Sequence, residues 1–290
     1  MSTMHTITKH QPFTLILSGG GGRGLAHVGV LRALEHEGFR PSAVVGVSMG
    51  AIVAVSYVLN PQWYSALVTM DTSEFPEPPK RPENDLRARI RSLLASERAL
   101  LDMFVGWGAG ERALGFGKKL LRGLTGGGRL EAGRIPVALI ASDLQSGKRV
   151  VIRQGDAVDA AYASAALPGV LPPLRRGRQL LADGSYTDNA PVDVARDLCA
   201  GPAIAVDVSQ TEEACQIHNG FQAMMRAMEI CHHAHAQIRF QEADLVLKPH
   251  FPFPIDGLDF DHKHTCIAAG VQVVRHNIKA LRDKLVMPPS

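Results

Sequence analysis

Short apolar runs alternate with helical patterns in the first sixty residues of the chain. Residues 13–17 (FTLIL) predict a buried strand, and residues 28–34 carry apolar side chains at helical spacing until Gly38 ends the pattern. A second apolar run at residues 43–47 predicts another strand, and residues 49–59 predict a buried helix. This β-α-β-α order is typical of a sheet that carries helices on its faces.

The same alternation returns after residue 135. Five further strand candidates follow, with the sequences IPVALIAS, RVVIR, RQLLA, PAIAVDV and DLVLK. Helical patterns lie between and after them, at residues 157–166, 192–200, 221–241 and 266–285. We therefore predict one α/β domain over residues 1–290, with a mainly parallel central sheet and helices on both of its faces.

The segment between these two halves has a different composition. A proline-rich stretch begins near residue 75, and residues 80–134 hold twelve Lys or Arg against six Asp or Glu. Leu86 and Leu93 share an apolar helical face there, with Arg87 and Arg91 off it. We predict that residues 75–134 form a basic helical insertion. Such a segment either lies on an anionic membrane surface as a lid over a site, or packs on the sheet as a solvated helical pair.

Charge and hydropathy narrow the class of protein. A formal net charge of +3 is too small to indicate a nucleic-acid partner. Residues 41–70 carry no charge, but the glycines, Asn60 and Pro61 within them favour a buried strand, turn and helix over a membrane span. The first residues lack the apolar run of a secretory signal, which predicts a cytoplasmic protein, with peripheral membrane contact through the basic segment. The sequence leaves the oligomeric state open.

A glycine-rich turn, LSGGGGRGL, joins the first predicted strand to the first predicted helix. Gly19, Gly21 and Gly24 match the GxGxxG pattern of dinucleotide-binding turns. However, the second strand ends in GVSMG instead of the acidic residue that would bind a ribose, and no GK[ST] follows the glycines. A regulatory protein that binds nucleotide phosphates with this turn therefore stays the alternative hypothesis.

The second junction between strand and helix predicts a catalytic serine. GVSMG matches the GxSxG elbow, in which a serine lies on a sharp turn. Side chains at Gly46 and Gly50 would collide with that turn, and the N-terminus of the next helix favours negative charge at Ser48. The bare N–H groups of the glycine turn would then form an oxyanion hole, with Arg23 fastening the turn or adding positive field.

A serine nucleophile needs a base, and the sequence leaves three aspartates as candidates. Asp143, Asp183 and Asp207 each follow an apolar strand, at the sheet edge where α/β proteins form their sites. Gly184 favours Asp183 because it allows a tight turn that exposes the carboxylate, whereas loop hydrogen bonds account for the other two. The twelve histidines are not excluded by their number, although the late ones lie in helical patterns or near charged loops.

Several motifs occur together in an order that resembles the patatin-like phospholipase family, especially its compact bacterial members related to the neuropathy target esterase catalytic domain. They are GGGGRG (19–24), GVSMG (46–50), ASAALPGVLPP (163–173) and DGSYTDNAPV (183–192). Together with VGVLRALE and PAIAVDVS they extend over most of the chain. Ser185 departs from the family pattern, in which Ala or Gly follows the Asp-Gly pair.

The resemblance implies a patatin-like, three-layer α/β fold and a lipid acyl hydrolase. It implies a Ser-Asp dyad without a catalytic histidine, with Ser48 as the nucleophile and Asp183 as the general base. Gly20, Gly21 and Gly22 would form the oxyanion hole, and the reaction would need no cofactor and no metal. The expected substrates are phospholipids, lysophospholipids or other fatty-acyl esters.

A metal-binding module is a further alternative. Its candidate ligands are Cys231, His232, His233 and His235, with His262 and His264 further along the chain. Their spacing does not match the paired patterns of zinc sites, and a solvated helix face accounts for them better.

Overall fold

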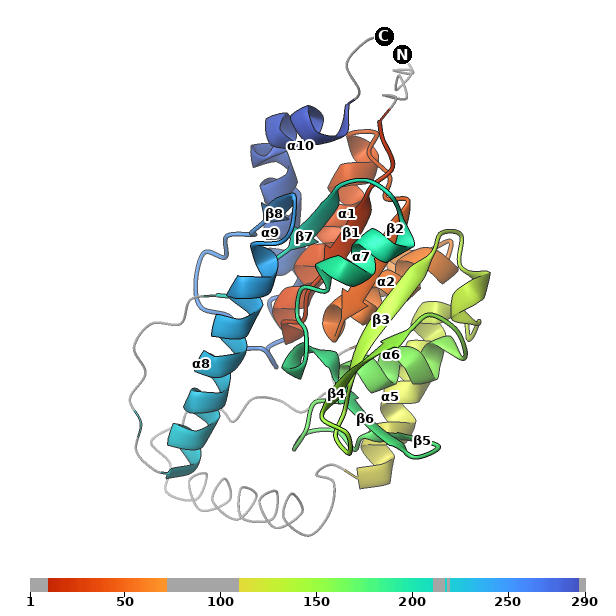
Figure 1. The fold of residues 1–290 in the computed structure, drawn as a ribbon, viewed down its shortest axis with the longest axis vertical. Helices are drawn as coiled ribbons and strands as arrows, with labels where there is room; N and C mark the ends of the chain where they lie inside the picture. The colour runs from red at the N-terminus through yellow and green to blue at the C-terminus, as the bar shows by residue number, and fades with distance from the viewer. Residues whose placement is uncertain (1–9, 72–109, 211–216, 218–219, 287–290) are drawn as a thin grey trace.

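A computed structural model of the chain describes residues 10–71, 110–210, 217 and 220–286. Most of the predicted basic insertion, including Leu86 and Leu93, lies outside these residues. The described part has the predicted three-layer α/β architecture, with a mainly parallel sheet between two layers of helices (Figure 1). Within it, no helix has both the length and the apolar character needed to cross a bilayer.

The described part of the chain contributes eight strands to one sheet. They are β1 (Thr14–Leu17), β2 (Ala43–Val47), β3 (Val137–Asp143), β4 (Lys148–Ile152), β5 (Leu174–Arg176), β6 (Gln179–Asp183), β7 (Ala203–Val206) and β8 (Leu245–Leu247). Their order is β5-β6-β3-β2-β1-β7-β8, and β4 also pairs with β3. The run from β3 to β8 is parallel, whereas β4, β5 and β6 join by antiparallel pairs.

Helices cover both faces of this sheet. They are α1 (Ala26–His36), α2 (Met49–Leu59), α3 (Trp63–Val68), α5 (Gly110–Thr125), α6 (Ala157–Ala165), α7 (Val192–Leu198), α8 (Gly220–Phe240), α9 (Lys263–His276) and α10 (Ile278–Leu285), with the short 3-10 helices η1 (Gly21–Leu25), η2 (Leu130–Ala132) and η3 (Gly184–Tyr186). The side chains of β1 show how the faces divide. Leu15 and Leu17 pack in one core with α1, α2, α6 and α9, and Ile16 packs in the other with α7 and α8.

Two strands share one edge of β3 and meet end to end. β2 ends with Val47 beside Ile140, and β6, which runs in the opposite direction, ends with Asp183 beside Ala141. Because β4 occupies the other edge of β3 at the same level, β2 and β6 must lie in line on this edge. Strand pairing alone therefore brings Ser48, which follows Val47, next to Asp183, which ends β6.

Most of the elements predicted from the sequence are confirmed, and one is wrong. The strand at residues 43–47 and the helix at residues 49–59 match β2 and α2. The single helix predicted over residues 266–285 is two helices, α9 and α10, which meet at Asn277. The Asn277 side chain donates a 2.8 Å hydrogen bond to the Val273 carbonyl, so it competes with the backbone for the last turn of α9.

Two glycines allow α1 and α9 to cross at close range. A Cβ atom on Gly270 of α9 would lie 1.9 Å from the Ala26 carbonyl oxygen of α1. In the reverse direction, a Cβ atom on Gly29 of α1 would lie 1.9 Å from the Ile267 carbonyl oxygen of α9. The backbones therefore touch where any other residue would hold them apart, and α1, which follows the glycine-rich turn, is fastened to α9.

We predict that Gly270→Ala lowers the free energy of unfolding by about 1–3 kcal/mol, because the added methyl group forces two packed backbones apart. The matched control is Gly123→Ala on α5, an exposed helical glycine around which a Cβ would meet no atom within 4 Å. That change should raise stability by up to about 1 kcal/mol through helix propensity. Urea unfolding of both variants measures the difference, and equal effects would contradict the close contact.

Candidate active site

Ser48 lies on a strained turn between β2 and α2. Its φ of 53° and ψ of −123° make it the one non-glycine residue with positive φ in the described part of the chain. Such a conformation costs about 1–3 kcal/mol and is characteristic of functional sites. Gly50 permits the turn, because a Cβ there would lie 2.1 Å from the Leu17 carbonyl oxygen, and a Cβ on Gly46 would lie 2.5 Å from the Ala51 Cα atom.

The Ser48 hydroxyl is hydrogen-bonded to a buried carboxylate. Ser48 Oγ donates to Asp183 Oδ2 at 2.5 Å, across the point where β2 and β6 meet. Asp183 is only 3% exposed, and its other oxygen, Oδ1, accepts hydrogen bonds from the Ser185 N–H at 2.9 Å and from the Ser185 hydroxyl at 2.7 Å. The serine and the aspartate that the sequence predicted as nucleophile and base are therefore in direct contact, without an intervening histidine.

Burial raises the pKa of Asp183 above its ordinary value. The hydrogen bonds from Ser48 and Ser185 and the charge of His232 act in the opposite direction, but they do not cancel the cost of desolvation. Asp183 is thus a stronger base than a solvent-exposed aspartate, which improves its match to the weakly acidic serine hydroxyl.

The other two candidate aspartates, Asp143 and Asp207, accept hydrogen bonds from residues near them in the fold and not from Ser48. Asp143 accepts hydrogen bonds from the Leu180 N–H at 3.0 Å and from the Ser146 hydroxyl at 2.7 Å, and these bonds lower its pKa. Asp207 accepts one from the Ser209 N–H at 2.9 Å. Among the three aspartates that the sequence left open, Asp183 is the one that contacts Ser48.

The described histidines make no hydrogen bond to Ser48 or Asp183. His27 is buried in the first turn of α1, where it donates to the Ser18 carbonyl at 2.8 Å, and burial lowers its pKa to about 4. His232 on α8 lies near the site, with its ring edge-on to Tyr186 at a centroid distance of 5.9 Å. Burial lowers the pKa of His232 as well, which favours the neutral imidazole.

The glycine-rich turn lies beside Ser48, and its glycines differ in what their N–H groups bind. The Gly19 N–H donates to Asn189 Oδ1 at 2.6 Å, and the Gly22 N–H donates to the Gly257 carbonyl at 2.7 Å. Gly20 and Gly21 line the cavity described below, and their N–H groups have no acceptor among the described residues. The N–H of Gly22, which the family resemblance implied as a third oxyanion donor, is thus bound to Gly257 in this structure.

Close packing holds the turn in this conformation. Gly21 has a φ of +56°, and a Cβ there would lie 1.8 Å from the Gly257 carbonyl oxygen. Gly24 packs against the Met49 side chain in the same way. Arg23 donates to the Ile255 carbonyl at 3.1 Å, which fastens the turn to the loop before α9.

Two supporting residues were not identified from the sequence. The Ser48 N–H donates to Ser164 Oγ at 3.0 Å, and that hydroxyl donates in turn to the Ile140 carbonyl at 2.5 Å. Asn189 holds Gly19, as described above. Ser164 lies in the motif ASAALPG, and Asn189 lies in the motif DGSYTDN. Both side chains are polar and buried, and a polar residue within a largely apolar motif is the feature of the sequence that could have identified them.

A cavity of about 790 Å³ opens onto these groups. Ser48, Asp183, Gly20 and Gly21 lie in its wall. The rest of the wall is mostly apolar, and includes Ile52, Phe116, Leu120, Leu121, Leu167, Val170 and Leu171. A site of this kind can hold a long apolar group next to the serine hydroxyl.

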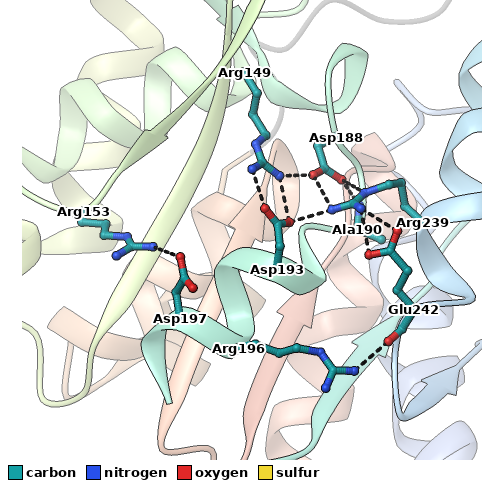
Figure 2. Close-up of polar contacts among 9 residues, drawn as sticks. All are labelled: Arg149, Arg153, Asp188, Ala190, Asp193, Arg196, Asp197, Arg239 and Glu242. Carbon is teal, nitrogen blue, oxygen red and sulfur yellow. Dashed lines mark hydrogen bonds and ion pairs between the residues drawn. The ribbon is translucent and has the colours of Figure 1, made fainter. Parts of the chain in front are cut away.

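An ion cluster fixes the loop that follows η3. Asp188 is 3% exposed and binds Arg149 of β4 and Arg239 of α8, and both arginines also bind Asp193 of α7 (Figure 2). Arg149 lowers the pKa of Asp193 to about 2. Because Asn189 follows directly, the cluster holds the residue that binds the glycine-rich turn.

The candidate metal ligands do not converge. Among the residues that the structure describes, no group of three or more His, Cys, Asp or Glu side chains is arranged to hold a metal ion. His262, one of those candidates, is hydrogen-bonded to Asp259 at 2.7 Å.

Residues 15–196, more than half of the chain, match the patatin-like phospholipase family. A patatin-like phospholipase domain-containing protein of Caenorhabditis elegans is 35% identical over 203 residues, which cover 69% of this chain and 14% of that protein. An uncharacterised NTE family protein of Mycobacterium bovis is 30% identical over 200 residues, which cover 68% of this chain and 30% of that protein. The chain therefore spans less than a third of the length of either relative. VipD from Legionella pneumophila aligns with a TM-score of 0.45 and 14% identity, over 97% of this chain and 71% of that chain.

We predict that Asp188→Asn lowers the free energy of unfolding by about 2–3 kcal/mol, because it leaves Arg149 and Arg239 without a buried counter-charge. The matched control is Asp197→Asn, which removes an aspartate that is 69% exposed and pairs with Arg153 at the surface. That exposed pair should contribute less than about 1 kcal/mol. Urea unfolding of the two variants tests this, and similar losses would show that the cluster does not hold the loop.

Proposed function

Because this chain belongs to the patatin-like phospholipase family, we propose that it is a serine acyl hydrolase that cleaves fatty-acyl esters of lipids. The observation that carries the proposal is the 2.5 Å hydrogen bond from Ser48 Oγ to the buried carboxylate of Asp183. It lies in a mostly apolar cavity, beside glycine N–H groups that have no acceptor among the described residues.

The first chemical step is the attack of Ser48 on the ester carbonyl. As Ser48 Oγ forms a bond to the carbonyl carbon, Asp183 accepts the hydroxyl proton through the existing hydrogen bond. The strained backbone of the elbow keeps the hydroxyl exposed to the cavity, and the N-terminus of α2 lies beneath the developing charge.

The carbonyl oxygen acquires a negative charge in this step. The N–H groups of Gly20 and Gly21 donate to it and so form the oxyanion hole. The absence of side chains on this turn lets the ester approach the backbone, and the contacts of Gly22 and Arg23 hold the two donors in place before the substrate binds. Preorganised donors of this kind each contribute about 2.7–4 kcal/mol to lowering a barrier.

Collapse of the tetrahedral intermediate breaks the ester C–O bond. Asp183 returns its proton to the leaving alcohol oxygen, and Ser48 is left as an acyl ester. A water molecule then attacks the acyl carbon while Asp183 accepts one of its protons. The bond between the acyl carbon and Ser48 Oγ breaks, Asp183 returns that proton to Ser48 Oγ, and the fatty acid leaves. Each proton in this cycle passes through one carboxylate.

The cavity favours a long acyl chain as the part of the substrate that is bound. Leu120 and Leu121 of α5 contribute to its wall, so the described end of the predicted insertion borders the site. This contact supports a lid role for residues 75–134. Contact of that segment with an anionic membrane surface is also part of the proposal, and it rests on basic residues that mostly lie outside the described range.

We predict that Ser48→Ala reduces hydrolysis of p-nitrophenyl and lysophospholipid esters to background, and that Asp183→Asn lowers kcat by about 10²–10⁴-fold through loss of the base. Asp143→Asn is the matched control, because Asp143 also ends a strand but binds Leu180 and Ser146 instead of the nucleophile. That control should retain the rate within about threefold. A fully active Asp183→Asn variant would move the base to another residue.

The raised pKa of Asp183 predicts a second, thermodynamic effect of Asp183→Asn. A folded-state pKa above the unfolded value, about 3.9, contributes stability below that pH and loses it as the pH rises through the folded-state pKa. The variant should therefore gain stability relative to wild type as the pH rises from about 4 through the folded-state pKa of Asp183. Urea unfolding at several pH values measures this, and a difference that does not change with pH would contradict the buried, ionised carboxylate.

A further inference from the structure

The Asp183 carboxylate accepts two of its three hydrogen bonds from one residue. The Ser185 N–H donates to Asp183 Oδ1 at 2.9 Å, and the Ser185 hydroxyl donates to the same oxygen at 2.7 Å. Ser48 binds Oδ2, the opposite oxygen. The carboxylate is thus held at both ends, and the hydroxyl of Ser185 is the side chain that holds the end away from the nucleophile.

Asp183 has no ion pair with a lysine or arginine among the described residues. Two titratable groups face it: His232 from α8 and Tyr186 from η3. Other elements packed around Asp183 also carry titratable side chains, but each of these is exposed or binds another group. They are Asp143 on β3, Asp159 and Tyr162 on α6, Arg175 and Arg176 on β5, and Arg23 on η1. The buried negative charge of Asp183 is therefore stabilised mainly by hydrogen bonds from Ser48 and Ser185.

We propose that Ser185 is a positioning residue, whose hydroxyl turns Oδ2 of Asp183 toward Ser48 and keeps the buried base ionised. This inference rests on the proposed function, because it assigns a role within the same site. The hydrogen bond requires a donor after Gly184, and neither alanine nor glycine at this position supplies one. Ser185 does not react with the substrate in this account.

Two effects should follow when the hydroxyl is removed. The ionised carboxylate loses a charge-assisted hydrogen bond, so the pKa of Asp183 should rise further, by about one unit. The carboxylate also keeps only the Ser185 N–H on Oδ1, so it is held less firmly and its Oδ2 atom points to Ser48 for a smaller fraction of the time. The first effect moves the acid limb of the rate profile, and the second lowers kcat more than it raises KM.

The chain offers a matched control. Ser146 donates from its hydroxyl to Asp143 Oδ2 at 2.7 Å, which is the same kind of contact at the end of another strand. Asp143 does not contact Ser48, so Ser146→Ala removes an equivalent hydrogen bond without touching the proposed base. Its pH profile should match that of wild type.

The test compares wild type, Ser185→Ala and Ser146→Ala in hydrolysis of p-nitrophenyl butyrate from about pH 4 to about pH 9. We expect the acid limb of kcat/KM to move up by about one pH unit in Ser185→Ala alone, with a several-fold lower kcat at high pH. Ser185→Thr, which restores a hydroxyl, should return the limb toward wild type. An acid limb that stays in place in Ser185→Ala would overturn the role of Ser185.

A measurement without turnover separates this inference from the proposed function. Carboxyl carbon NMR of the resting protein follows the titration of Asp183, which is identified by its absence from the Asp183→Asn spectrum. The midpoint should rise in Ser185→Ala whether or not the chosen ester is a substrate. An unchanged midpoint refutes the inference on Ser185, whereas full hydrolysis by Ser48→Ala refutes the proposed function.

Discussion

The contact between Ser48 and Asp183 exists because two strands end against each other on the same edge of β3. β2 delivers the serine elbow from one direction, and β6 delivers the aspartate from the other, beside the consecutive residues Ile140 and Ala141. The separation of the two groups is therefore set by strand register, which is strongly specified in a sheet with buried faces. This geometry leaves no space for a histidine between the Ser48 hydroxyl and the Asp183 carboxylate, since the two groups are already in contact.

This arrangement costs stability, and the surrounding residues offset the cost. Ser48 adopts an unfavourable backbone conformation, and Asp183 is buried without an ion pair to a lysine or arginine among the described residues. Ser164 binds the Ser48 N–H, Asn189 binds the glycine-rich turn, and the Asp188 cluster holds Asn189 in position. A site of this kind fits the general observation that local strain gathers where function requires it.

The sequence predicted the individual motifs of this site better than the contacts between them. The GxSxG elbow follows from a motif between an apolar strand and an apolar helix, and β2 and α2 have the predicted bounds. Among Asp143, Asp183 and Asp207, local pattern favoured Asp183 only through the turn at Gly184, because all three lie at or directly after the end of a strand, and the family resemblance implied Asp183. The contact of Asp183 with Ser48 depends on the antiparallel pairing of β6, which joins distant segments. The engagement of the Gly22 N–H by Gly257 is equally long-range and was not predicted.

The most direct test is a crystal structure of the protein after reaction with a fluorophosphonate that carries an alkyl chain. We predict a covalent bond to Ser48 Oγ, a phosphoryl oxygen within hydrogen-bond distance of the Gly20 and Gly21 N–H groups, and the alkyl chain in the apolar cavity. An adduct on another residue, or a phosphoryl oxygen directed away from both glycines, would contradict it.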